Sequence, residues 1–299
     1  MNRMLWIGTG LVVGVILLLL LVTRVFTSIL AFPETFPCDR PDQLELYYFC
    51  GPPSEQDLTY EDVEFHSKDG TVLRGWWIPA PSRKVVVFAH GRNSGRWMAS
   101  RFLRPLHDAG FNVLTFDFRA HAGSDGDFSS LGFHEQEDLI AAIDFAAGKN
   151  MERIGLAGYS MGGATGILAM ARDERVQAGL FESAFANVSD QIADNAASMG
   201  VPRWPLVPLV LAHYAYRGNM DLTRMNPEDV IGSIAPRPVL LIHGDQDPVI
   251  SIEHGYRLLE AAGEPRDHWW IPGGSHVNST NMDRARAEGI MVEFFQRYL

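Results

Sequence analysis

Cysteine is almost absent from the sequence: Cys38 and Cys50 are the only two among 299 residues. Metal sites in proteins gather several Cys, His, Asp or Glu ligands at close spacing, whereas here the ten histidines and the acidic residues are scattered. We therefore expect no bound metal ion and no cofactor. The two cysteines form an even pair in a loop-like segment. They are compatible with a disulfide in an oxidising compartment or with two unpaired thiols.

Positive charge is also scarce. Lys and Arg number 25 against 36 Asp and Glu, and the formal net charge is −11. A nucleic-acid-binding protein needs a basic face for the phosphates, so nucleic acid is excluded as a main partner. Internal repeats and low-complexity tracts are absent as well. The hydrophobic fraction of 46% and the charged fraction of 20% are those of a globular protein.

Charge is missing altogether between Leu5 and Val22, a run of 18 residues dominated by Leu, Val and Ile. Such a run is long enough for a membrane-spanning helix. The alternative is a cleaved signal peptide, but the run exceeds the usual signal-peptide core and no Ala-x-Ala-like site follows closely. Arg3 and the terminal amine precede the run. The positive-inside bias therefore weakly favours a single-pass membrane protein whose body is extracytoplasmic.

The rest of the chain divides by composition. Frequent prolines and little periodicity between 31 and 60 predict a linker that follows the anchor at 1–30. One folded domain then occupies 61–299. Within it, the segment from about 183 to 226 interrupts an otherwise regular alternation and is interpreted as a small, irregular cap insertion.

The domain at 61–299 has the pattern of an α/β protein. A hairpin is predicted over 62–78, because Asp69-Gly70 separates two strand-like runs. The continuous apolar run Val85 to Ala89 is typical of a strand buried on both faces of a parallel sheet. Further strands are predicted at 112–118, 153–157, 176–181, 238–242 and 268–271, and helices at 98–109, 135–147, 163–170, 252–262 and the C-terminus. We expect a mostly parallel central sheet with helices on both faces.

The motif Gly-Tyr-Ser-Met-Gly at 158–162 lies between a predicted strand and a predicted helix. In that context a Gly-x-Ser-x-Gly turn presents the serine oxygen at the end of the strand, which is the geometry of a nucleophile. The motif alone is common. Its context therefore has to support the chemistry.

Three other strand ends supply that context, since sites in open parallel sheets form at the carboxyl ends of the strands. Hydrolysis through serine needs a base, a carboxylate that orients the base, and backbone N–H groups for the oxyanion. His276 and Asp247 are the expected base and acid for Ser160, and the N–H groups of Met161 and Arg92 are the expected oxyanion donors. The weaker alternatives are Asp245 for the acid and His90, His121 or His243 for the base.

From about residue 61 onward, these motifs make the chain resemble the α/β-hydrolase superfamily. The similarity is greatest to the membrane-anchored serine hydrolases of the BEM46-like group and the serine-aminopeptidase-like enzymes. The resemblance implies the fold, the three side chains above and the second position of Gly-Asp-x-Asp as the acid. The relatives usually have Arg-Gly-His-Gly where this chain has alanine at Ala120 and Ala122, so the loop is expected to follow a different path. Arg92 replaces a small or uncharged residue, and its guanidinium either attracts anionic substrates or is simply solvated.

The resemblance implies acyl transfer, with a carboxylic ester, lipid ester or thioester as the expected small-molecule substrate. A peptidase is the main enzymatic rival, and a non-catalytic binding protein of the same fold is the other alternative. The apolar stretch 204–214 is interpreted either as a lid over an acyl chain or as a cap packed on the sheet. Neither the natural substrate nor the oligomeric state follows from the sequence.

Overall fold

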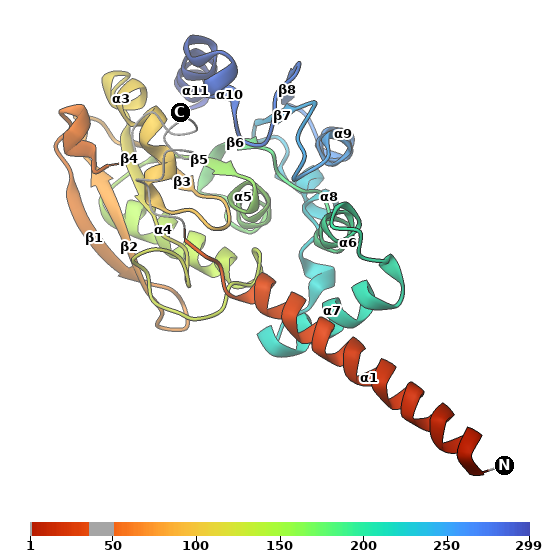
Figure 1. Cartoon of the computed structure of the whole chain (residues 1–299). Coiled ribbons are helices and arrows are strands. Elements are labelled where there is room, and N and C mark those ends of the chain that lie inside the picture. Colours follow the sequence, from red (N-terminus) through yellow and green to blue (C-terminus); the bar gives the residue numbers. More distant parts are fainter. Residues whose placement is uncertain (1, 36–50) are drawn as a thin grey trace.

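One mixed sheet of eight strands organises the part of the chain that the computed structural model describes, residues 2–35 and 51–299 (Figure 1). The strand order is β1-β2-β4-β3-β5-β6-β7-β8. The pairs β1–β2 and β2–β4 are antiparallel, and all others are parallel. The strands are β1 Glu61–His66, β2 Val72–Ile78, β3 Lys84–Ala89, β4 Asn112–Phe116, β5 Arg153–Tyr159, β6 Val176–Glu182, β7 Val239–Gly244 and β8 Arg266–Ile271. The predicted hairpin and mostly parallel sheet are confirmed.

Strand β3 shows why the sequence of a central strand is a continuous apolar run. Val85 and Val87 contact one hydrophobic cluster, and Val86 and Phe88 contact another. Helices α4 and α5 contribute to the first cluster, and α3 and α11 contribute to the second. Because successive side chains of a strand point to opposite faces, a strand covered on both sides needs apolar residues throughout.

Helices cover both faces of the sheet (Figure 1). They are α3 Ser100–Asp108, α4 Glu135–Gly148, α5 Met161–Arg172, α8 Pro227–Val230, α9 Ile252–Ala261, α10 Ser279–Met282 and α11 Arg284–Tyr298. The bounds of α3, α4, α5, α9 and α11 agree with the sequence predictions to within a few residues, whereas the short helices α8 and α10 were not predicted.

The insertion between β6 and β7 is helical, so the prediction of an irregular segment is wrong. It contains α6 (Val188–Ser198) and α7 (Arg203–Gly218), with non-helical backbone at Trp204. Asn187 caps α6 by accepting hydrogen bonds from the next turn. The sequence does not predict these helices because α6 is rich in short Ala, Ser and Asp side chains and α7 contains Pro208, which obscure a 3.6-residue period.

The N-terminal helix α1 (Asn2–Ala31) projects from the body and touches it only near its C-terminal end (Figure 1). Thr23, Thr27 and Ala31 are buried at a spacing of four residues, and His213 of α7 shares a hydrogen bond with Thr27, 3.0 Å between Nδ1 and Oγ1. Most apolar side chains from Leu11 to Leu21 are exposed. The segment Thr9–Ala31 is long and apolar enough to cross a membrane.

The predicted linker is described only at its two ends. Residues 53–56 form a 3-10 turn, and Gln56 binds the α3 helix by donating from Nε2 to Ser100 O at 2.8 Å. Cys38 and Cys50 lie outside the described residues, so their pairing stays a prediction.

Candidate active site

Ser160 occupies the sharp turn between β5 and α5. Its backbone has φ 53° and ψ −120°, outside the regions that residues with a side chain ordinarily adopt. The turn is held on both sides, because Ser160 N donates to Glu182 O of β6 and Ser160 O accepts from Ala164 N of α5. The backbone of Ser160 is therefore strained, and its conformation is fixed by the sheet and the helix.

The glycines of the motif are required by close backbone contacts. A β-carbon at Gly158 would lie 2.5 Å from Gly162 O, and one at Gly162 would lie 2.2 Å from Ala89 O of β3. Side chains at either position would push the helix away from the sheet. Gly91 is also close, because a β-carbon there would lie 3.2 Å from the Ser160 Cβ.

Three of the predicted side chains meet above the carboxyl edge of the sheet. His276 Nε2 lies 3.0 Å from Ser160 Oγ, and His276 Nδ1 lies 2.7 Å from Asp247 Oδ2. The carboxylate can only accept, so His276 donates from Nδ1 and its Nε2 accepts the hydrogen bond from the serine hydroxyl. This tautomer leaves the lone pair of Nε2 available to remove the proton of Ser160.

Asp247 is held in its ionised form. Burial favours the neutral acid, but hydrogen bonds with His243 and His276 and with the backbone N–H of Ile250 keep the pKa of Asp247 well below its ordinary value. Its side chain is 0% exposed, and Oδ1 accepts from Val249 N and Ile250 N at 2.8 and 2.9 Å. The carboxylate is thus desolvated yet fully hydrogen-bonded, as orienting a base requires.

Asp245, the alternative acid, serves a different purpose. It is exposed, and its Oδ1 accepts from Gly273 N at 2.7 Å. Two further bonds join the same loops, from Asp245 N to Ile271 O and from Gln246 N to Gly274 O. Asp245 therefore ties the loop that carries Asp247 to the loop that carries His276.

The predicted oxyanion donors line the same cleft as Ser160 and His276, a cavity of about 520 Å³. Within the described part of the chain, the backbone N–H groups of Met161 and Arg92 have no hydrogen-bond acceptor in the protein. Met161 begins helix α5, where N–H groups are left unsatisfied and the helix dipole is positive. Both donors are available to a ligand oxygen in the cleft.

The side chain of Arg92 fits neither expectation made for it. Its Nη2 donates to Ile29 O and, at 3.4 Å, to Leu30 O, the carbonyls at the C-terminal end of α1. A cation at this end of a helix is favourable because the free carbonyls there carry partial negative charge. Burial lowers the pKa of the guanidinium. Arg92 therefore joins the turn beside Ser160 to the N-terminal helix.

The other candidate bases, His90, His121 and His243, each bond a backbone carbonyl oxygen. His90 accepts from Phe118 N at Nε2, 2.9 Å, and donates from Nδ1 to Gly91 O, 2.7 Å. Burial, with a contribution from His121, lowers the pKa of His90 well below its ordinary value, so it stays neutral. His243 donates to Ile250 O at 2.8 Å. None of the described His, Cys, Asp and Glu side chains forms a group of three suited to a metal ion.

Two alanines in the loop that follows β4 have a backbone conformation typical of glycine. Ala120 has φ 58° and Ala122 has φ 43°, both in the left-handed region that costs an L-residue about 1–2 kcal/mol. Hydrogen bonds hold the loop in place: Asp117 accepts from Gly123 N at 3.0 Å, and Arg119 forms an ion pair with buried Asp138 at 2.6 Å. The alanines therefore do not require the loop to follow a different path, because their backbone adopts the strained left-handed conformation.

We expect glycine at Ala120 to stabilise the protein by about 1 kcal/mol, since it removes this strain. The melting temperature of the solubilised full chain should then rise by about 2–4 °C. Ala212, exposed in the interior of α7, is the matched control. There the same change should cost about 1 kcal/mol. A fall in melting temperature for both variants would show that the loop carries no strain.

Sequence reasoning missed the support beneath the base. Val277, next to His276, has φ 49°, an unusual conformation for a β-branched residue. Fully buried Arg101 of α3 donates to Val277 O at 3.0 Å, and Glu182 accepts from Ser279 N at 3.0 Å. Of these residues, only Glu182 could have been singled out from the sequence, because it is a carboxylate at the carboxyl end of a predicted parallel strand. Arg101 reads as an ordinary polar position of an amphipathic helix.

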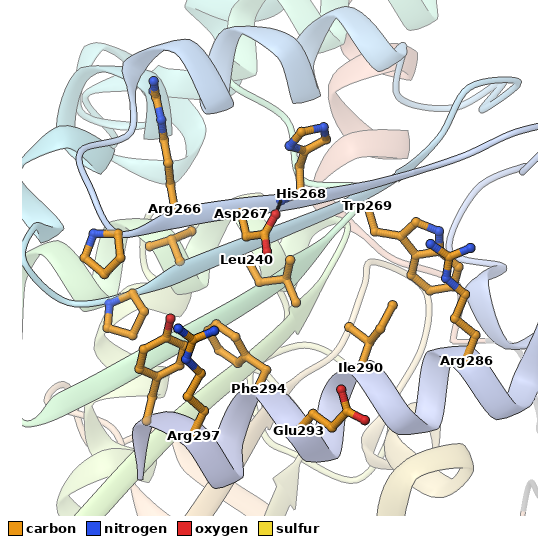
Figure 2. Close-up of a pocket in the computed structure, with 14 residues that line it drawn as sticks. Leu240, Arg266, Asp267, His268, Trp269, Arg286, Ile290, Glu293, Phe294 and Arg297 are labelled. Carbon is orange, nitrogen blue, oxygen red and sulfur yellow. Dashed lines mark hydrogen bonds between the residues drawn. The ribbon is translucent and has the colours of Figure 1, made fainter.

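A second cavity, of about 550 Å³, lies at the amino ends of the strands, opposite the carboxyl ends where Ser160 lies, and is not part of this site (Figure 2). It is lined by residues at the amino ends of β7 and β8, such as Arg266, and by α11. Figure 2 shows Arg286 beside Trp269, with the guanidinium carbon 4.8 Å from the ring centre. Chemistry in parallel sheets concentrates at the opposite edge, where Ser160 lies.

Comparisons with known proteins show the family and the fold of the chain. A family model described as "Alpha/beta hydrolase family" matches residues 86–288. The uncharacterized protein YfhR of Escherichia coli K12 is 31% identical over 229 residues, covering 73% of this chain and 74% of that protein. The alpha/beta hydrolase domain-containing protein WAV2 of Arabidopsis thaliana is 27% identical over 248 residues, covering 76% and 75%. A solved esterase of Pyrococcus furiosus superposes with a TM-score of 0.69 at 28% identity, covering 83% of this chain and 94% of that one.

Proposed function

The chain belongs to the alpha/beta hydrolase family, and on that premise we propose that it is a membrane-anchored serine esterase. The observation that carries the chemistry is the position of His276, hydrogen-bonded to Ser160 at 3.0 Å and to Asp247 at 2.7 Å. The likeness to an esterase over most of both chains supports ester rather than amide cleavage.

In the proposed first step, Ser160 Oγ attacks the ester carbonyl carbon while His276 Nε2 takes its proton. The carbonyl oxygen becomes an oxyanion that accepts hydrogen bonds from the N–H groups of Met161 and Arg92. Asp247 holds the ring and stabilises the imidazolium. The carbon–oxygen bond to the alcohol then breaks, and the alcohol leaves with the proton from His276, so that the acyl group remains on Ser160.

The second step repeats the first with water. His276 Nε2 takes a proton from the water as its oxygen attacks the acyl carbon. The same two N–H groups hold the second oxyanion. Its collapse breaks the bond to Ser160 Oγ, which regains the proton from His276, and the carboxylic acid leaves. No cofactor is needed for either step, since every proton passes through one imidazole.

Ester and amide substrates separate this proposal from its enzymatic rival. We expect the full chain to hydrolyse p-nitrophenyl acetate and to leave aminoacyl p-nitroanilides uncleaved, with a difference in kcat/KM of at least about a hundredfold, the scale of one well-placed transition-state contact. The measurement is the initial rate of nitrophenol or nitroaniline release at equal enzyme concentration. Faster cleavage of the anilide would make the protein a peptidase.

The anchor is supported by α1, whose apolar side chains from Leu11 to Leu21 are mostly exposed. Left in water, such a surface would be an aggregation hazard, and in a bilayer it is favourable. With Arg3 on the cytoplasmic side, the body is extracytoplasmic. Trypsin added outside sealed vesicles should degrade the body when the extracytoplasmic face of the vesicle membrane is on the outside, and should leave it intact in inverted vesicles. A body released by alkaline carbonate would show that α1 does not span.

A further inference from the structure

An apolar cavity of about 150 Å³ lies between α1, α6 and α7, beside the cleft that holds Ser160. Phe26 of α1, Ala196 of α6 and Val207 of α7 each form part of its wall. Of its twelve lining residues only Arg92 and Asn195 are polar. Cavities of this size with apolar walls stay dry and take up hydrocarbon, of about the volume of benzene.

This cavity adjoins the cleft. Leu30, Arg92, Ile192 and Asn195 line both of them. Because Arg92 also supplies one of the proposed oxyanion donors, a chain leading away from a carbonyl at Ser160 passes these four residues and then enters the cavity. The hydrogen bonds from Arg92 to the end of α1 hold one of these shared residues in place.

The other side of the cavity faces the surface where α1 leaves the body. Met199, one of its lining residues, is 62% exposed. The adjoining cap also exposes Trp204 (78%) and Tyr216 (83%), residue types enriched at the membrane–water interface. The fully buried positions of α1 begin at Thr23, and the 18 residues before it span about 27 Å, close to the hydrocarbon thickness of a bilayer. The cap therefore meets the membrane surface.

We propose that this cavity binds the acyl chain of a membrane lipid ester. The chain enters between α1 and the cap helices, its methyl end occupies the cavity, and its carbonyl reaches Ser160. The assignment rests on the proposed esterase function and deepens it, because it names the substrate as an ester of a chain longer than the cleft holds. The cavity takes about six carbons beyond the cleft.

The first test compares p-nitrophenyl decanoate with the acetate, using the full chain in phosphatidylcholine nanodiscs. Ala196→Leu fills the cavity, and Ala197→Leu, at the exposed neighbouring position of α6, is the matched control. One excluded methylene lowers kcat/KM about fourfold. We expect the decanoate-to-acetate ratio of kcat/KM to fall at least about tenfold for Ala196→Leu and to be unchanged for Ala197→Leu. Equal ratios in all three proteins would overturn the proposal.

The second test does not depend on turnover. A phosphatidylcholine with a diazirine near the methyl end of one chain is placed in the nanodisc and irradiated, and the adducts are mapped by peptide mass spectrometry. We expect adducts in α6 and α7 of the wild type and their loss in Ala196→Phe. Adducts confined to residues 9–22 of α1 would overturn the acyl site even if the protein is an esterase. Adducts in α6 and α7 without ester hydrolysis would retain the site and remove the esterase.

Discussion

Alanine at Ser160 should lower kcat/KM for p-nitrophenyl acetate by about 10⁴-fold or more. The substitution removes the oxygen that forms the acyl-enzyme while the backbone donors and the cleft remain, so a residual rate above that in water is expected. The measurement is nitrophenol release by the two proteins at matched concentration, after their melting temperatures have been compared.

Ser233 provides a control for this substitution, because it is exposed and its hydroxyl donates only to Val230 O in its own turn. Alanine there should leave the rate within about twofold, as surface changes away from a site usually do. If the Ser160→Ala protein is folded and keeps a tenth of the wild-type rate, another residue is the nucleophile.

The second large effect is expected for Asp247→Asn. The amide preserves the shape of the side chain but can donate to His276 Nδ1, which favours the tautomer whose Nε2 carries a proton and cannot act as base. A loss of about 10⁴-fold in kcat is the scale of such a change. The strongly lowered pKa of Asp247 means that the wild-type carboxylate is ionised at the neutral pH of the assay.

Asp245→Asn distinguishes the two acids that the sequence offers. The amide oxygen can still accept from Gly273 N, and Asp245 does not touch His276, so kcat should change by no more than about threefold. Comparable losses in the two variants would indicate that the loop as a whole, rather than the carboxylate of Asp247, determines the rate.

The sequence was most informative where chemistry depends on short segments. The run Val85 to Ala89 predicted a strand buried on both faces, because its residues alternate between two hydrophobic clusters. The glycines around Ser160 indicated the sharp turn between strand and helix, because backbone atoms lie within 2.5 Å of the positions that their β-carbons would occupy. The order of Ser160, Asp247 and His276 along strand ends predicted that they would meet, and the structure brings them together.

What the sequence could not supply are the contacts between distant segments. Arg101 supports the loop of His276 from 176 residues away, and nothing near Arg101 in the sequence marks it as buried. The contact of Arg92 with the end of α1 is equally remote, because a hydrogen bond to a backbone carbonyl leaves no trace in its partner's identity. The cap helices were missed for a local reason, the prolines and short side chains that conceal their period.

The packing of α1 changes how the anchor is understood. A membrane helix predicted from apolar composition alone would be a passive tether. Here its C-terminal turns bind α7 through Thr27 and bind the turn beside Ser160 through Arg92. The N-terminal helix and the candidate active site are thus joined by direct contacts, and the acyl site that we propose lies at their junction.

The most direct test of the central claim is to locate the nucleophile chemically. The full chain is treated with a fluorophosphonate, digested, and the modified peptide sequenced by mass spectrometry. The account predicts a single phosphonylated residue, Ser160, and loss of the adduct when His276 is replaced by alanine, since the serine is then no longer activated. An adduct on any other residue, or labelling of Ser160 that does not require His276, would contradict it.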